Sequence, residues 1–144
     1  MSGEQNIGAL RRLIEEGFGH GDLQVVDEVV DSGLVEHQPG IAPPDRDGVK
    51  RAIRFLHTAF PDMHVQIKHE VADGDLAWCH FTARGTHLGP FGRVPPTGKS
   101  YEIDVIDIAR FKDGRIVEHW GVPDRFSQLE QLGLLALGRE PVMR

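Results

Sequence analysis

The chain of 144 residues has little cysteine, tyrosine and tryptophan, and it contains no long hydrophobic run. The single cysteine, Cys79, excludes an intrachain disulfide and a cluster of thiolate metal ligands. Because Cys79 lies in a strand-like run, we expect a buried, inert thiol. No stretch approaches the ~20 apolar residues that a membrane-spanning helix requires, and the N-terminus lacks the apolar core of a signal peptide. These absences predict a cytoplasmic protein without a membrane partner.

Positive charge is also scarce. Lys and Arg number 16 against 22 Asp and Glu, which gives a net charge of −6, and no basic block is present. Nucleic acid and anionic membrane are therefore poor candidates as partners. A hydrophobic content of 40% and a charged content of 26% are typical of a globular protein. No linker or internal repeat divides the chain, so we expect one domain over residues 1–144.

Apolar residues recur at helical spacing in the first part of the chain. This periodicity predicts helices over residues 4–18, 22–33 and 47–60. Ser2, Asp22 and Asp47 are the expected N-caps, since short polar side chains accept hydrogen bonds from the first turn. We expect the glycines at 17, 19 and 21 to break the first helix. Pro61 should end the third, because proline disfavours helical geometry in the residue before it.

The second part of the chain alternates apolar and polar residues, which predicts antiparallel strands between residues 64 and 120. A short strand over residues 34–37 precedes them, and a last helix follows Pro123. Asp73-Gly74 and Asp113-Gly114 are hairpin signals. In the first of these strands, one face should carry Val65, Ile67, His69 and Val71, the pattern of a sheet with one buried face. In a later strand, a single face should carry Tyr101, Ile103, Val105, Asp107, Ala109 and Phe111. Helices followed by strands predict an α+β fold, in which the helices and a curved sheet form a cone whose mouth can admit a small ligand.

Carboxylates and histidines gather in or beside these predicted strands. Period-two alternation puts Asp104 and Asp107 on opposite faces, so at most one can enter the cavity. It also puts His119 on the face opposite Ile116. A carboxylate with apolar neighbours becomes a useful general base. Taken singly, each such residue more often has a structural role, and Asp124 fits equally well as the N-cap of the last helix.

Other chemistries lack their motifs. The eight histidines include no HExxH pair, so we expect no metal site. No GxSxG elbow supports a serine nucleophile. The loop GRVPPTGKS is one residue too long for a phosphate-binding P-loop, and its prolines lack the N–H groups that hold phosphate.

Several motifs together resemble one known family. The segments GDLQVVDEVV, VEHQP, FPDMHVQI, GTHLGPFGRVPPTGK, IARFKDGRIVEHWGVPD and LEQLGLL occur in the order found in the SnoaL-like polyketide cyclases, also called predicted ester cyclases. This family lies in the superfamily that resembles nuclear transport factor 2 (NTF2-like). The resemblance implies an NTF2-like cone and a homodimer or homotetramer formed through the sheet.

The resemblance also implies roles for individual residues. Asp124 stands where the cyclases carry a catalytic carboxylate after the HW motif, and His119 would assist it at the enolate oxygen. The implied reaction is an intramolecular aldol ring closure of a small apolar or aromatic carbonyl ligand, without a cofactor. Where many relatives carry Arg, this chain has His80. The expected substrate contacts are Trp120, His37, His87, His80, Asp107, Arg110 and Phe60.

Three alternatives stay open at this point. The same cone can host other proton chemistry, including an isomerase that uses a buried tyrosine, here Tyr101, or a cofactor-free hydroxylase. Epoxide hydrolysis would require an arginine, Arg84 or Arg110, between Asp107 and Asp124. The third alternative is a small-ligand-binding protein that is not an enzyme.

Overall fold

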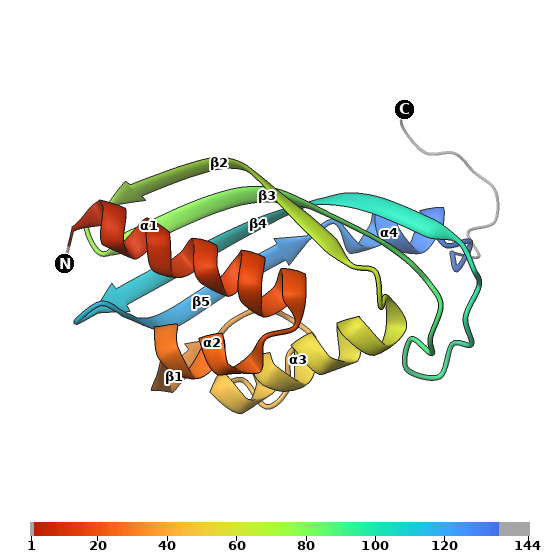
Figure 1. Cartoon of the computed structure of the whole chain (residues 1–144), viewed down its shortest axis with the longest axis horizontal. Helices are drawn as coiled ribbons and strands as arrows, with labels where there is room; N and C mark the ends of the chain where they lie inside the picture. The colour runs from red at the N-terminus through yellow and green to blue at the C-terminus, as the bar shows by residue number, and fades with distance from the viewer. Residues whose placement is uncertain (1, 136–144) are drawn as a thin grey trace.

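A computed structural model describes residues 2–135 of the chain, which fold as a five-stranded sheet with helices packed against it (Figure 1). The helices and strands are α1 Gly3–Arg12, a π-helical segment Leu13–Gly19, α2 Leu23–Val29, β1 Val30–Glu36, α3 Arg46–Ala59, β2 His64–Asp73, β3 Leu76–Thr86, β4 Ser100–Lys112, β5 Arg115–Pro123 and α4 Arg125–Gln131. The predicted α+β class is confirmed.

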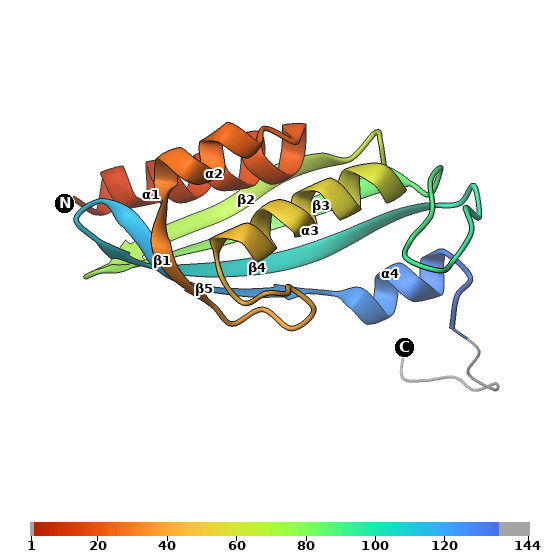
Figure 2. The same cartoon turned by 90° about the horizontal axis from the view of Figure 1, so that it is seen from below.

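The strand order is β1-β5-β4-β3-β2. β1 pairs with β5 in parallel, and the other neighbours are antiparallel. The curved sheet has α1, α2 and α3 on one side, while α4 follows the end of β5 (Figure 2). This one-sided cover is the reason that alternate residues of each strand are buried. None of the described helices is both long and apolar enough to cross a membrane.

The predicted N-caps and helix ends agree with the structure except at two places. Ser2 is the predicted N-cap of α1 and also forms a capping box with Gln5, and Asp22 caps α2. α3 is capped by Asp45 rather than Asp47, because the Asp45 carboxylate accepts from the Gly48 amide. The predicted second helix stops well before residue 33, since Val30 pairs with Ile116 and starts β1.

Two of the three glycines that were expected to break the first helix do not break it. Gly17 and Gly19 lie within the π-helical segment that continues α1. The chain leaves the helix at Gly21, whose φ of +77° is a conformation that glycine adopts at little cost. This continuation carries Phe18 toward the mouth of the fold, where it lines the cavities described below.

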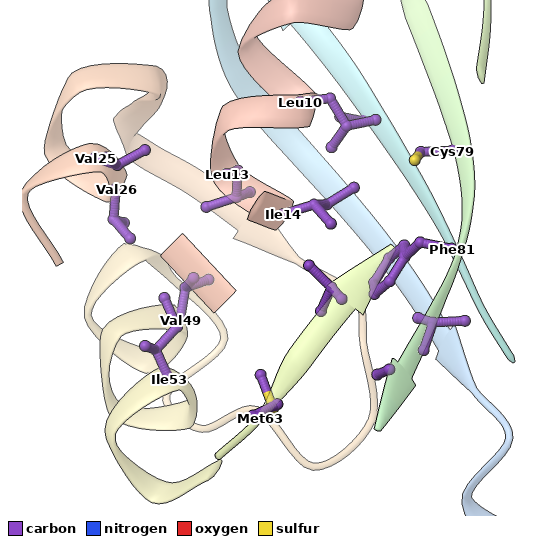
Figure 3. Close-up of a cluster of buried hydrophobic side chains, with 14 of the residues drawn as sticks. Leu10, Leu13, Ile14, Val25, Val26, Val49, Ile53, Met63, Cys79 and Phe81 are labelled. Carbon is purple, nitrogen blue, oxygen red and sulfur yellow. The ribbon is translucent and has the colours of Figure 1, made fainter. Parts of the chain in front are cut away.

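The core lies between the helices and the inner face of the sheet (Figure 3). Leu10 and Ile14 from the first helix and Ile53 from α3 pack against strand residues such as Phe81. The six residues of β4 that were predicted to share a face are all buried, as the alternation required: Tyr101, Ile103, Val105, Asp107, Ala109 and Phe111. β4 is therefore the central strand of the core, and Asp107 is the polar exception on it.

β-bulges overturn two face assignments. The register between β2 and β3 shifts between Ile67 and His69, so His69 and Val71 are exposed although Val65 is buried. A second shift lies where β5 meets Arg110 and Phe111. Because a bulge adds one residue to one strand, it reverses the faces of the residues beyond it. Ile116 and His119 are consequently both buried, where simple alternation put them on opposite faces.

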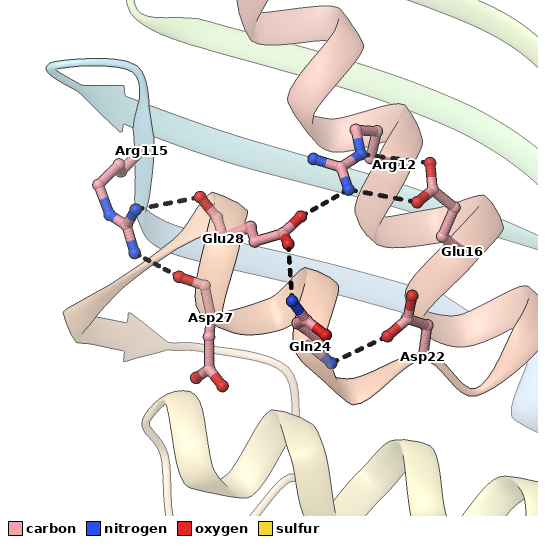
Figure 4. Close-up of polar contacts among 7 residues, drawn as sticks. All are labelled: Arg12, Glu16, Asp22, Gln24, Asp27, Glu28 and Arg115. Carbon is pink, nitrogen blue, oxygen red and sulfur yellow. Dashed lines mark hydrogen bonds and ion pairs between the residues drawn. The ribbon is translucent and has the colours of Figure 1, made fainter.

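Arg115 at the start of β5 ties the sheet to α2 (Figure 4). Its guanidinium donates hydrogen bonds to the backbone oxygens of Asp27, Glu28 and Val30 at 2.7–3.0 Å. These carbonyls end α2 and have no partner within the helix. Nearby, Arg12 bridges Glu16 and Glu28, which links the first helix to α2.

We expect Arg115→Met to lower the free energy of unfolding by about 2 kcal/mol, because it removes the charge-assisted hydrogen bonds to three backbone carbonyls. Urea denaturation measures the change. Arg84→Met, at an exposed sheet position, serves as the control and should change stability by less than about 0.5 kcal/mol. Equal effects of the two substitutions would contradict the anchoring role of Arg115.

Candidate active site

The structure contains an open groove that leads into a small inner cavity. The groove has a volume of about 770 Å³ and lies along α3, between the loop over residues 38–42 and Phe91. The inner cavity has a volume of about 60 Å³ and lies against the inner faces of β2, β3 and β4. Phe18, Gln38, Leu56 and Arg125 line both spaces and form the neck between them. The groove has the size of a ligand site, whereas the inner cavity can hold only the end of a ligand.

The inner cavity is mostly apolar, with polar groups at particular points. Among the described residues that line it, Asp107 is the only carboxylate, and Tyr101, Gln38, Arg125 and Gln128 supply the other polar side chains. The apolar lining is Phe18, Leu56, Met63, Val65, Phe81, Ala83, Ile103, Val105 and Pro123. A single acid in apolar surroundings, with a few convergent polar groups, is typical of a catalytic or binding pocket.

Behind Asp107 lies a buried chain of ionisable groups. His119 Nδ1 is 2.7 Å from Glu36 Oε2 and 2.9 Å from Oε1. His119 Nε2 lies 3.2 Å from Asp107 Oδ2, without the alignment of a full hydrogen bond. The three side chains are at most 5% exposed. The imidazole therefore lies between two carboxylates, of which only Asp107 reaches the cavity.

The two carboxylates determine the charge of His119. Burial by itself lowers the pKa of the imidazole, but Asp107 and Glu36 outweigh burial and raise the pKa from 6.5 to about 10. His119 is therefore a cation at neutral pH, and it lies between two buried carboxylates. Elsewhere on the cavity wall, burial raises the pKa of Tyr101 to about 12, so this phenol stays protonated and can donate a hydrogen bond.

Gly121 makes room for a polar group beside Asp107. The two residues are paired in register across β4 and β5. A Cβ atom at position 121 would overlap the side-chain oxygen of Gln38 and lie 3.0 Å from Asp107 Oδ1. The missing side chain thus allows the Gln38 amide to enter the neck next to the carboxylate.

The structure brings together two of the residues proposed from sequence, Asp107 and His119. Asp107 faces the cavity and Asp104 faces outward, as alternation predicted for one of the two. His119 does not line either cavity, and it reaches the cavity only through Asp107.

Asp124 lies elsewhere than expected. Its side chain is exposed, and its carboxylate accepts a hydrogen bond from the Ser127 amide as the N-cap of α4. It lines neither the groove nor the inner cavity. The expectation that the Asp124 carboxylate lies in the cavity is therefore wrong, and the alternative that Asp124 is the N-cap of α4 is confirmed. The residue that follows, Arg125, enters the neck instead.

Three of the proposed substrate contacts form a separate network on the outer face of the sheet. His37 stacks on Trp120 at a centroid distance of 4.8 Å and contacts Glu118 at 2.9 Å. Arg110 pairs with Glu118 and Asp75. On β5, Glu118 and Trp120 flank the inward-facing His119 and therefore point outward. The sheet separates this network from the cavity.

The remaining candidates also lie outside the cavity lining. His80 is on the outer face, with Nδ1 3.0 Å from His69 Nδ1 and Nε2 2.8 Å from Asp104. Phe60 is fully buried and packs edge-on against Tyr101. His87 is fully buried and accepts from the Thr97 amide, which anchors the loop between β3 and β4. Phe60 and His87 support the cavity wall from behind.

Sequence reasoning missed Glu36, Gln38 and Arg125. Glu36 follows Leu34 at period two on β1, so its inward direction was available from the pattern, but the neighbouring His37 was chosen. Gln38 and Arg125 lie just beyond strand ends, where alternation carries no information. Among residues 2–135, no group of three His, Cys, Asp or Glu side chains is arranged to bind a metal ion.

Comparisons with known proteins give consistent results. Residues 8–132 match the family model of the SnoaL-like polyketide cyclases. Aklanonic acid methyl ester cyclase DnrD from Streptomyces peucetius is 26% identical, over 88% of this chain and 90% of the relative. The structure of IdmH from Streptomyces antibioticus, classed as a polyketide cyclase, is 38% identical with a TM-score of 0.78, over 90% of this chain and 99% of that one. AclR from Streptomyces galilaeus, classed as a hydroxylase, is 25% identical with a TM-score of 0.80, over 93% and 88% of the two chains.

The raised pKa of His119 predicts a specific pH dependence of stability. Its contribution is complete below about pH 6.5 and is lost as the pH rises toward 10. We expect the unfolding free energy of the wild type to fall over this window, by up to about 1.4 kcal/mol for each unit. His119→Gln should abolish this decline, whereas His37→Gln, at an exposed site, should retain it. Ring ¹⁵N NMR provides a direct check, and a native His119 that titrates below pH 7 would refute the assignment.

Proposed function

Because the chain belongs to the SnoaL-like polyketide cyclase family, we propose that it catalyses an intramolecular aldol ring closure with Asp107 as the acid and base. The observation that carries this proposal is the position of Asp107. It is the carboxylate on the inner cavity, and the buried His119–Glu36 pair holds it there. The groove is large enough for a polyketide-sized ligand, whose reacting end would enter the inner cavity.

The proposed reaction balances without a co-reactant. Asp107 removes a proton from a carbon between two carbonyl groups and leaves an enolate. The enolate carbon attacks a second carbonyl carbon of the same molecule, so one C–C bond forms and the carbonyl oxygen becomes an alkoxide. The alkoxide takes the proton back from Asp107, and the carboxylate is regenerated. Product and substrate have the same atoms.

His119 and Glu36 act as positioning residues in this scheme. The imidazolium would fix the orientation of Asp107 before the substrate arrives. Glu36 in turn holds the imidazole through Nδ1. General-base catalysis contributes typically about 10²–10⁴-fold. The apolar walls would supply the remainder by folding a flexible chain into a geometry close to attack.

We expect Asp107→Asn to lower kcat by about 10²–10⁴-fold with little change in ligand affinity, because the amide cannot accept the proton. Asp104→Asn, on the opposite face of the same strand, is the matched control and should stay within about twofold of the wild type. Turnover of aklanonic acid methyl ester or a related diketo ester, followed by chromatography, measures the rate. Equal rates for wild type and Asp107→Asn would refute the role of Asp107.

The same assay separates Asp107 from Asp124, the carboxylate favoured by the family resemblance. Asn caps a helix about as well as Asp, so Asp124→Asn should preserve both the fold and, if Asp107 is the base, the turnover. Abolished turnover in Asp124→Asn with normal turnover in Asp107→Asn would move the catalytic role to Asp124.

A second candidate is an isomerase that uses the same base. Tyr101 lines the inner cavity with Asp107, and its protonated phenol could donate to an enolate oxygen. Isomerisation would stop after proton return to a different carbon, so the product would contain no new C–C bond. The position of Arg110, which pairs with Asp75 and Glu118 on the outer face, gives no support to epoxide hydrolysis.

We also propose that a second copy of the chain covers the outer face of the sheet. Four large apolar side chains are exposed there, with Val71 beside Trp78 and Ile106 beside Val122 in register. Trp78 is 43% exposed and Val122 is 67% exposed, which is costly for a face without a partner. A homodimer or homotetramer would bury these residues.

Trp78→Glu should convert the oligomer to a monomer, because it places a charge in the centre of the proposed interface. Sedimentation equilibrium measures the mass. Leu88→Glu, at an exposed apolar residue in the loop after β3, is the control and should leave the mass unchanged. A wild-type monomer at micromolar concentration would contradict the proposed interface.

A further inference from the structure

The groove is positively charged although the chain as a whole is acidic. Arg51 and Arg54 from α3 and Arg125 at the start of α4 line it. No Asp or Glu is among its described lining residues, whereas the net charge of the chain is −6. Three arginines without an acid on a concave surface favour binding of an anion.

The three arginines also lack partners within the described part of the protein. No described carboxylate lies within ion-pair distance of Arg51, Arg54 or Arg125. This contrasts with the arginines that do form ion pairs, which are Arg11, Arg12, Arg46 and Arg110. The guanidinium groups in the groove are therefore available to a ligand.

Arg125 is the most informative of the three. It is half-buried at the neck, where burial lowers its pKa, and its guanidinium donates to the side-chain oxygen of Gln128. Taking a cation out of water without a counter-ion is costly. A guanidinium has five N–H donors, so most of those on Arg125 remain free after the bond to Gln128.

We propose that the groove binds a substrate with a free carboxylate, which pairs with Arg125 while Arg51 and Arg54 attract it at the entrance. This inference rests on the proposed function and deepens it by naming the substrate class, a polyketide carboxylic acid. The planar fork of a guanidinium matches a carboxylate in bidentate geometry. The relative DnrD is named for a methyl ester, and an ester group is neutral where a free acid would carry a negative charge.

The location of Arg125 also gives the substrate a direction. Arg125 lines both spaces, and Asp107 lines only the inner cavity. A carboxylate held at the neck would therefore leave the adjoining carbonyl chain free to extend inward toward Asp107. The like charge of Asp107 disfavours the reverse orientation, in which the acid group enters the inner cavity.

Binding tests this inference without requiring turnover. A hydroxynaphthoic acid and its methyl ester form a matched, fluorescent pair, and titration gives the dissociation constant of each. We expect the acid to bind at least about tenfold more tightly than the ester, as charge-assisted hydrogen bonds predict. Arg125→Gln should bring the acid to the level of the ester and change ester binding by less than about twofold. Arg84→Gln, an exposed arginine outside the groove, should change neither.

Further variants distinguish the contribution of the arginines at the entrance from that of Arg125 at the neck. Arg51→Gln combined with Arg54→Gln should weaken acid binding only at low salt, because about 0.5 M salt screens exposed charges. If Arg125→Gln fails to fold, Arg125→Lys keeps the charge without the fork and should retain part of the preference for the acid.

Each other outcome overturns a distinct claim. Equal binding of acid and ester by the wild type would overturn the carboxylate but leave the proposed cyclisation intact. Absence of binding by either compound would count against the groove as a substrate site, and so against both. Tighter binding of coenzyme A than of the acid would reassign the arginines to a phosphate and overturn the carboxylate.

Discussion

The arrangement of the site depends on one buried contact, in which the His119 imidazolium lies between the carboxylates of Glu36 and Asp107. Two acids alone at this depth would repel each other and tend to take up protons. The cation between them offsets this repulsion, and it connects β1, β4 and β5 at their inner faces. The parallel pairing of β1 with β5 places Glu36 opposite His119 in register, so the topology of the sheet and the charge of the site have the same origin.

The two faces of the sheet place polar groups in different surroundings. On the outer face, His37, Glu118, Arg110 and Asp75 form a chain of ion pairs. On the inner face, few polar groups are present and apolar neighbours surround them. The same residue types therefore have different properties according to the face they occupy, and histidine content by itself says little about function.

The sequence predicted the class of fold, the main turns and the common face of Asp107 and its apolar neighbours on β4, because these follow from periodicity and local turn chemistry. It failed where one inserted residue changed the phase of a strand, as at the bulges that expose Val71 and bury His119 beside Ile116. Near the ends of strands, packing determines which of two adjacent side chains points inward. Glu36 rather than His37 turns to the inner side of the sheet, and Arg125 rather than Asp124 lines the cavity. No local preference distinguishes the members of these pairs.

Gly121 has a consequence for how relatives with this architecture can differ. Since the Gln38 amide occupies the volume that a side chain at position 121 would need, any larger residue there must displace Gln38 from the neck. The backbone of Gln38 is held by hydrogen bonds to Glu36 and Ile41, so only its flexible side chain needs to move in this exchange. A single codon thus selects between an amide and another functional group next to Asp107, and it offers a short route by which one scaffold can change the polar lining of its cavity.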